Sequence, residues 1–156
     1  MSIEIGEKAP MFTAEIDNSN ILALKDLIGK WIILYFYPKD NTPGCTKEAC
    51  SFRDNMSDLT KLGAEVIGIS PDTVKSHEKF KTKFDLNFNL VSDPERKICE
   101  KYGVIGEKNM FGKKVKGVIR STFIIDPKGK IRHIYKKVKV SGHTEAVMEK
   151  LKELQK

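Results

Sequence analysis

Cysteine is scarce in this chain. Its three cysteines among 156 residues are too few, and odd in number, for the disulfide framework of a secreted protein. The chain also lacks a run near the roughly 20 apolar residues of a membrane-spanning helix, and its N-terminus lacks a basic start followed by an apolar stretch. We therefore expect a cytoplasmic protein without a membrane segment. In a reducing compartment, a close pair of cysteines is typical of catalysis, redox chemistry or metal binding.

Internal repeats, linkers and low-complexity tracts are also missing. Of the 156 residues, 40% are hydrophobic and 31% are charged, a composition typical of a globular domain that can bury a core. The sequence therefore predicts one domain that spans residues 1–156.

Acidic residues are nearly absent from residues 108–139. This stretch holds eleven lysines and arginines against a single acidic residue, Asp126, so the formal net charge of +7 is local and the rest of the chain is net negative. Such a stretch could attract nucleic acid or an acidic protein. It contains no nucleic-acid-binding motif, and its lysines are interleaved with strand-like residues, which favours a solvated lysine face.

The apolar pattern predicts alternating strands and helices. Residues 31–37 (WIILYFY) and 65–70 (EVIGIS) are continuous apolar runs, which are typical of buried strands. Between them, apolar residues recur every three or four positions over 45–62, which predicts one amphipathic helix that ends at Gly63. The remaining predicted elements are a helix over 74–84, a strand over 88–93, a helical turn over 96–102, a hairpin over 120–135 with its turn at 126–129, and a helix over 143–154.

This element order indicates an α/β protein. A strand, a helix and a strand, followed by a β-hairpin and a terminal helix, form the order of the thioredoxin-like fold, with a mixed central sheet flanked by helices. Before residue 28, the segments AEID and LALKDL flank the turn-rich DNSN. They predict a small N-terminal β-hairpin extension in front of the fold.

The stretch YPKDNTPGCTKEAC, residues 37–50, holds two of the three cysteines. It lies between the first buried strand and the first long helix, where open α/β sheets place their ligands. Cys45 falls in the first helical turn, where free backbone N–H groups and the helix dipole stabilise a thiolate. Pro38 and Pro43 stiffen the approach to this turn. The Thr42 hydroxyl could donate to the thiolate or to a bound oxygen, and it could also cap the helix.

Each cysteine also has a structural interpretation. Cys45 lies on the same helical stripe as Phe52 and Met56 and could be a core residue. Cys50 projects away from that stripe and could be an exposed thiol. A zinc site would need two further ligands, and the three histidines lie far from the pair in the sequence, where hydrogen-bonded or solvated structural roles are expected for them. Cys99 is expected to pack in a core.

The spacing of Pro38, Thr42 and Cys45 resembles the active-site loop of the peroxiredoxins. The longer string FYPKDNTPGCTKEACSFRD is similar to that of the peroxiredoxin Q or bacterioferritin comigratory protein subfamily. The likeness continues through PDTVKSHEKF, KYGV and RSTFIIDPKGKI and covers nearly the whole chain.

The resemblance implies a thiol peroxidase that reduces hydrogen peroxide and organic hydroperoxides without a metal, flavin or haem. Cys45 matches the peroxidatic cysteine, which attacks the O–O bond and becomes a sulfenic acid. Cys50 matches the resolving cysteine, which forms an intramolecular disulfide with it. Thr42 matches the threonine that bonds thiolate and peroxide, Pro38 the proline that shields the pocket, and Arg120 the arginine that polarises the peroxide. Arg120 could otherwise be a surface residue of its strand.

The resemblance also implies partners. Thioredoxin or a similar dithiol reductant would recycle the disulfide, and a monomer or weak homodimer is favoured, with no nucleic acid or membrane as partner. Two other classes stay open. A general thiol–disulfide oxidoreductase would normally separate its cysteines by two residues, whereas four intervene here. A binding protein would act through residues 108–139, with the cysteines incidental.

Overall fold

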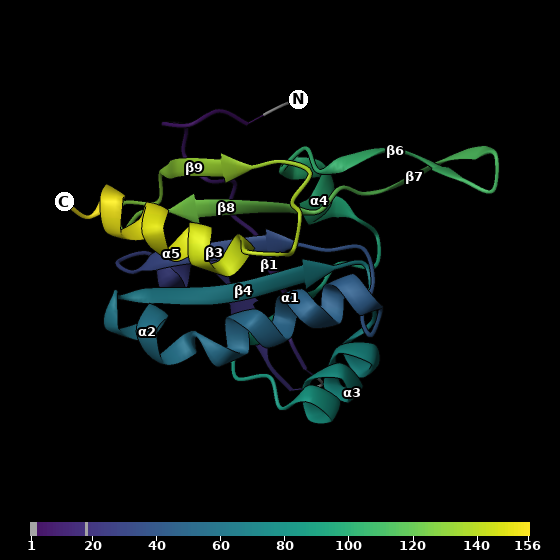
Figure 1. The fold of residues 1–156 in the computed structure, drawn as a ribbon, viewed down its shortest axis with the longest axis horizontal. Coiled ribbons are helices and arrows are strands. Elements are labelled where there is room, and N and C mark those ends of the chain that lie inside the picture. The colour runs from purple at the N-terminus through teal and green to yellow at the C-terminus, as the bar shows by residue number, and fades with distance from the viewer. Residues whose placement is uncertain (1–2, 18) are drawn as a thin grey trace.

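A five-stranded mixed sheet forms the centre of the computed structural model, which describes residues 3–17 and 19–156 (Figure 1). The strand order is β5-β4-β3-β8-β9. Strand β3 pairs in parallel with β4 and antiparallel with β8, and β4–β5 and β8–β9 complete the sheet as a parallel and an antiparallel pair. The strands are β3 (Trp31–Phe36), β4 (Ala64–Ser70), β5 (Asn89–Ser92), β8 (Ser121–Ile125) and β9 (Ile131–Tyr135). The predicted thioredoxin-like α/β fold is confirmed.

The apolar run of β3 is continuous because the strand faces two cores. Ile32, Leu34 and Phe36 enter a core with the N-terminal segment and α4 (Lys97–Lys101). Ile33 and Tyr35 enter the other, with α1 (Pro43–Asp54), α2 (Met56–Lys61), α3 (Val74–Phe84) and α5 (His143–Leu154). Side chains alternate across a strand, so a strand that is covered on both faces needs apolar residues at every position.

The predicted helix over 45–62 is wrong in one respect, because it consists of two helices. Helix α1 ends at Asp54, and α2 begins at Met56. Between them Asn55 leaves the helical conformation, with φ −105° and ψ 7°, and its side-chain amide donates to the Ser51 carbonyl at 2.8 Å. Asparagine competes in this way with the backbone for helical carbonyls, which bends or ends a helix.

A second hairpin was not predicted from the sequence. Strands β6 (Ile105–Met110) and β7 (Lys113–Val118) pair antiparallel and project from the body of the molecule (Figure 1). Phe111 and Gly112 form the turn with φ of 53° and 78°, the positive values that a two-residue hairpin loop favours. Lys113, Lys114 and Lys116 are exposed, as a solvated lysine face requires, and Phe111 is fully exposed at the tip.

The smaller predicted elements are present. Strands β1 (Thr13–Glu15) and β2 (Ile21–Ala23) form the N-terminal hairpin, followed by the 3-10 helix η1 (Leu24–Leu27); Asn18 of the predicted turn lies outside the described residues. At the β8–β9 turn, the Asp126 carboxylate accepts from the backbone N–H groups of Lys128 and Lys130. No helix among residues 3–17 and 19–156 has the length and apolar character needed to cross a membrane.

Candidate active site

The loop between β3 and α1 places Cys45 in the first turn of a twelve-residue helix. Pro43 is the first residue of the helix, where its missing N–H costs nothing and its fixed φ suits the helix. The Cys45 side chain is buried, with 1% of its surface exposed. The thiol therefore lies where the helix dipole and free N–H groups favour a negative charge.

Arg120, the residue before β8, contacts this thiol. Because β3 and β8 pair with Phe36 opposite Ser121, the residue before β8 meets the carboxyl end of β3. The Arg120 Nη2 donates to Cys45 Sγ at 3.2 Å. A Cβ at Gly44 would lie 3.2 Å from the same Nη2, so glycine lets the guanidinium approach the start of α1. Arg120 is thus part of the site and is not an ordinary surface residue.

Glu48 belongs to the site, although the sequence analysis missed it. Its Oε1 accepts from Arg120 Nη1 at 2.6 Å, and only 1% of the residue is exposed. Its Oε2 has no hydrogen-bond partner in the described part of the chain. Burial raises the pKa of Glu48 to about 7, against the opposing effect of Arg120. A carboxylate three residues after Cys45, on the same helix face, was the available signal.

Glu48→Gln is expected to change how stability depends on pH. Burial raises the folded pKa of Glu48 from 4.5 to about 7, so the stability that its proton contributes is complete below the unfolded value and is lost as pH rises through the folded value. The variant has no such proton. Its free energy of unfolding should therefore rise relative to wild type between about pH 5 and pH 8. Denaturant unfolding of both reduced proteins across that range would measure this; a difference that stays constant with pH would contradict it.

Thr42 and Pro38 lie on the loop that joins β3 to α1. Thr42 occupies the N-cap position of α1, as the capping interpretation expected, but its side chain makes no capping hydrogen bond within the described structure. The hydroxyl instead donates to the Lys39 carbonyl at 2.9 Å, a local bond that competes with capping. Pro38 is partly buried directly after Tyr37.

Cys50 shares α1 with Cys45, and the described thiols are all free. On a regular helix, five residues separate two Cα atoms by about 8.7 Å. Disulfides rarely bridge more than about 7 Å between Cα atoms. Cys50 is partly buried, so it is not simply an exposed thiol, and in the intact helix it cannot reach Cys45.

Cys99 lies apart from the site, in the core between the sheet and α4. Its side chain is completely buried. Burial raises the pKa of the Cys99 thiol well above its ordinary value, and the neighbouring Asp93 raises it further. The predicted core position of Cys99 is confirmed, and its thiol is expected to be inert.

A second cation, Lys108 of β6, also approaches the site. Its side chain lies across Gly117 of β7 and is partly buried. Burial lowers the pKa of Lys108, the Arg120 charge lowers it further, and Cys45 acts in the opposite direction. Strand β6 of the unpredicted hairpin therefore adds positive charge near the cysteine.

Comparison with known proteins identifies the family of this chain. The AhpC/TSA family matches residues 5–134. Peroxiredoxin Bcp of Bacillus subtilis is 46% identical over 154 residues, which cover 99% of this chain and 98% of that protein. The bacterioferritin comigratory protein of Xanthomonas campestris, studied for its alkyl peroxide reduction activity, superposes with a TM-score of 0.88 at 41% identity, covering 93% of this chain and 92% of its own. Xylella fastidiosa PrxQ gives a TM-score of 0.94 at 38% identity, covering 100% of this chain and 99% of that chain.

A match over most of the chain, together with a thioredoxin-like sheet that presents a cysteine at a helix start, defines the class: the chain belongs to the AhpC/TSA family. Within that family it is a peroxiredoxin of the Bcp/PrxQ subfamily, that is, a thiol peroxidase. The family and the activity class expected from the sequence are confirmed.

Proposed function

We propose that this peroxidase reduces hydrogen peroxide and organic hydroperoxides with Cys45, and that Cys50 resolves the product by forming a disulfide. The observation that carries the proposal is the 3.2 Å contact from Arg120 Nη2 to Cys45 Sγ at the start of α1. Helix terminus and guanidinium both favour the thiolate, which is the nucleophilic form of cysteine. The alkyl peroxide activity studied in the Xanthomonas relative supports the substrate class.

In the first step, the Cys45 thiolate attacks one oxygen of the hydroperoxide. A sulfur–oxygen bond forms and the O–O bond breaks, so that sulfur is oxidised to sulfenic acid and the peroxide is reduced. The leaving alkoxide or hydroxide takes up a proton and departs as alcohol or water. Negative charge therefore develops on the leaving oxygen, where a fixed guanidinium stabilises the transition state more than neutral substrate.

Thr42 and Pro38 would act on the substrate in this step. The Thr42 hydroxyl, which donates to the Lys39 carbonyl in the free site, would turn its proton toward thiolate or peroxide when substrate binds. Pro38, partly buried between β3 and the loop, would exclude water from the pocket.

In the second step, the Cys50 thiol attacks the sulfenic sulfur, releases water and leaves a disulfide. Both residues lie on α1, where a regular helix separates their Cα atoms by about 8.7 Å, so this step requires the start of α1 to unwind. Helix ends open at low cost, and opening would expose the disulfide to thioredoxin or a similar dithiol reductant. While opening is pending, a second peroxide could oxidise Cys45 to sulfinic acid.

The disulfide form is expected to lose amide protection over residues 46–55, because that part of α1 must unwind. Hydrogen exchange of the reduced protein and of the oxidised protein, with the disulfide confirmed by mass, would measure the difference. Helix α3 serves as an internal control and should keep its protection in both forms. Equal protection of α1 in both forms would contradict the unwinding.

The proposed function is tested by turnover of hydrogen peroxide and of an alkyl hydroperoxide with thioredoxin, its reductase and NADPH. NADPH consumption that depends on peroxide supports it. Reduction of a protein disulfide without any reaction with peroxide would favour a general thiol–disulfide oxidoreductase instead. Inertness toward both, with salt-sensitive retention on nucleic acid or an acidic protein, would favour binding through residues 108–139.

A further inference from the structure

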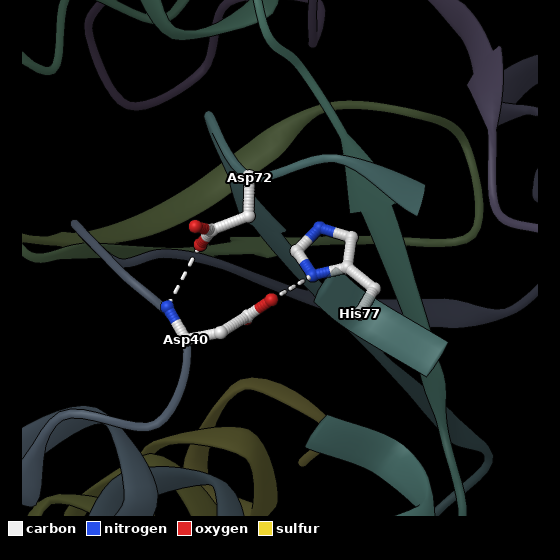
Figure 2. A group of neighbouring side chains, drawn as sticks. All are labelled: Asp40, Asp72 and His77. Atoms are coloured by element: carbon white, nitrogen blue, oxygen red, sulfur yellow. Dashed lines mark hydrogen bonds and ion pairs between the residues drawn. The ribbon is translucent and has the colours of Figure 1, made fainter. Parts of the chain in front are cut away.

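Asp40 is buried in the middle of the loop that joins β3 to α1, with 6% of its surface exposed. Its carboxylate accepts hydrogen bonds from the Tyr37 hydroxyl at 2.6 Å and the Ser76 hydroxyl at 2.8 Å, and it lies 2.7 Å from His77 Nδ1. Its backbone N–H donates to Asp72 Oδ2 at 2.7 Å. Figure 2 shows Asp40 held between the Asp72 carboxylate and the imidazole ring. The loop is therefore fastened to α3 and to the segment after β4.

His77 of α3 is completely buried, and both of its ring nitrogens have a hydrogen-bond partner. Its Nε2 lies 3.1 Å from the Val91 carbonyl of β5, which can only accept, so Nε2 carries a proton. Its Nδ1 lies 2.7 Å from Asp40 Oδ2, which also accepts from the Ser76 hydroxyl. The imidazole thus joins β5 to the active-site loop through two hydrogen bonds.

The side chains of Asp40, Asp72 and His77 have the spacing of a metal site. Their ligand atoms lie within 4.8 Å of one another. Each is already engaged: Asp72 Oδ2 accepts from the Ser70 hydroxyl as well as from the Asp40 backbone, and the ring nitrogens of His77 serve Asp40 and Val91. Polar groups that satisfy one another in this way form a rigid network, and we assign it a positioning role.

We propose that His77 is a positioning residue for the peroxide step, acting through Asp40, and this rests on the proposed function of Cys45. Asp40 stands two residues after Pro38, two before Thr42 and five before Cys45. The pair of Asp40 and His77 fixes the part of the loop that follows β3. The turn at Asn41, with φ 59°, comes directly after it. Unwinding is thereby confined to the helix side of the loop, while Pro38 and Thr42 keep their places.

Two substitutions of His77 separate its two hydrogen bonds. In His77→Asn, the amide can replace Nδ1 and donate to Asp40, but the bond to Val91 is lost. In His77→Gln, the longer amide can replace Nε2 and donate to Val91, but the bond to Asp40 is lost. The rates of Cys45 oxidation by peroxide would be measured by stopped flow in a Cys50→Ser background. His133→Gln, on β9, serves as the control for a histidine outside the network.

His77→Gln is expected to slow Cys45 oxidation by about 10- to 100-fold, the scale for a misplaced reactive group. His77→Asn should stay within about 3-fold of the control, since the bond to Asp40 positions the loop. Amide exchange over residues 39–44 should rise in His77→Gln and stay near wild type in His77→Asn. Equal losses in both variants, or wild-type rates in both, would overturn the proposal.

If His77→Gln does not fold, Asp40→Asn tests the same hydrogen bond between Asp40 and His77. It keeps the size of the side chain and weakens the bond from His77, so faster exchange over residues 39–44 and slower Cys45 oxidation are expected; wild-type values of both would overturn the proposal. Failure of the proposed function is distinguishable, because a wild-type protein that is inert to peroxide would still show whether His77 protects the loop from exchange.

Discussion

Cys45→Ser is expected to reduce the reaction with peroxide to the background level. Serine keeps the position at the start of α1 and the contact with Arg120, but its hydroxyl is not ionised at neutral pH and is a weak nucleophile toward oxygen. The loss should therefore appear in a single turnover with stoichiometric peroxide as well as in steady state. Sulfenic acid trapping followed by mass spectrometry would identify the oxidised residue.

The other two cysteines provide matched controls. Cys50→Ser should react once with peroxide at nearly the wild-type rate and then fail to turn over with thioredoxin, because the sulfenic acid has no resolving partner. Cys99→Ser should be close to wild type in both assays, since the thiol is buried away from the site. A Cys45→Ser protein that still reacts stoichiometrically with peroxide would refute the assignment of Cys45.

Arg120→Met is expected to slow the peroxide step by a factor on the order of 10² or more, the usual scale for one lost donor to a developing charge. The guanidinium donates to Cys45 Sγ and to Glu48 Oε1 at once. Its loss removes the cation that favours the thiolate and leaves the Glu48 carboxylate buried without its partner. Rapid-mixing measurements of Cys45 oxidation, with the thiolate followed by its ultraviolet absorbance, would separate ionisation from chemistry.

Two further arginine variants sharpen this test. Arg120→Lys keeps the charge, but a single ammonium group cannot replace the two guanidinium nitrogens that donate to Cys45 and Glu48. An intermediate rate is therefore expected. Arg132→Met removes an arginine of β9 that pairs with Asp126 and should leave the peroxide step at the wild-type rate. If Arg120→Met oxidises as fast as Arg132→Met, the arginine does not act in this reaction.

Local patterns were sufficient for much of the fold. The helix predicted over 74–84 has the bounds of α3, because its limits are local: the Thr73 side chain accepts from the Ser76 backbone, and Asp85 ends the helix in a left-handed conformation. The position of Cys45 at a helix start could likewise be read from an apolar strand, two prolines and an amphipathic pattern. The break at Asn55 was missed, because helical periodicity continues across it while the side chain takes a backbone carbonyl.

The sequence by itself determined the order of the central strands, the helix start at Cys45 and the family of the protein, because each depends on residues close together along the chain. Tertiary structure decided what surrounds the thiol. Arg120 meets Cys45 across 75 positions of sequence, and His77 meets Asp40 across 37. The pKa of Glu48 moves to about 7 because other elements cover it. Burial and charge pairing depend on distance in space, and only the pairing of β3 with β8 and the packing of α3 beside β5 set those distances.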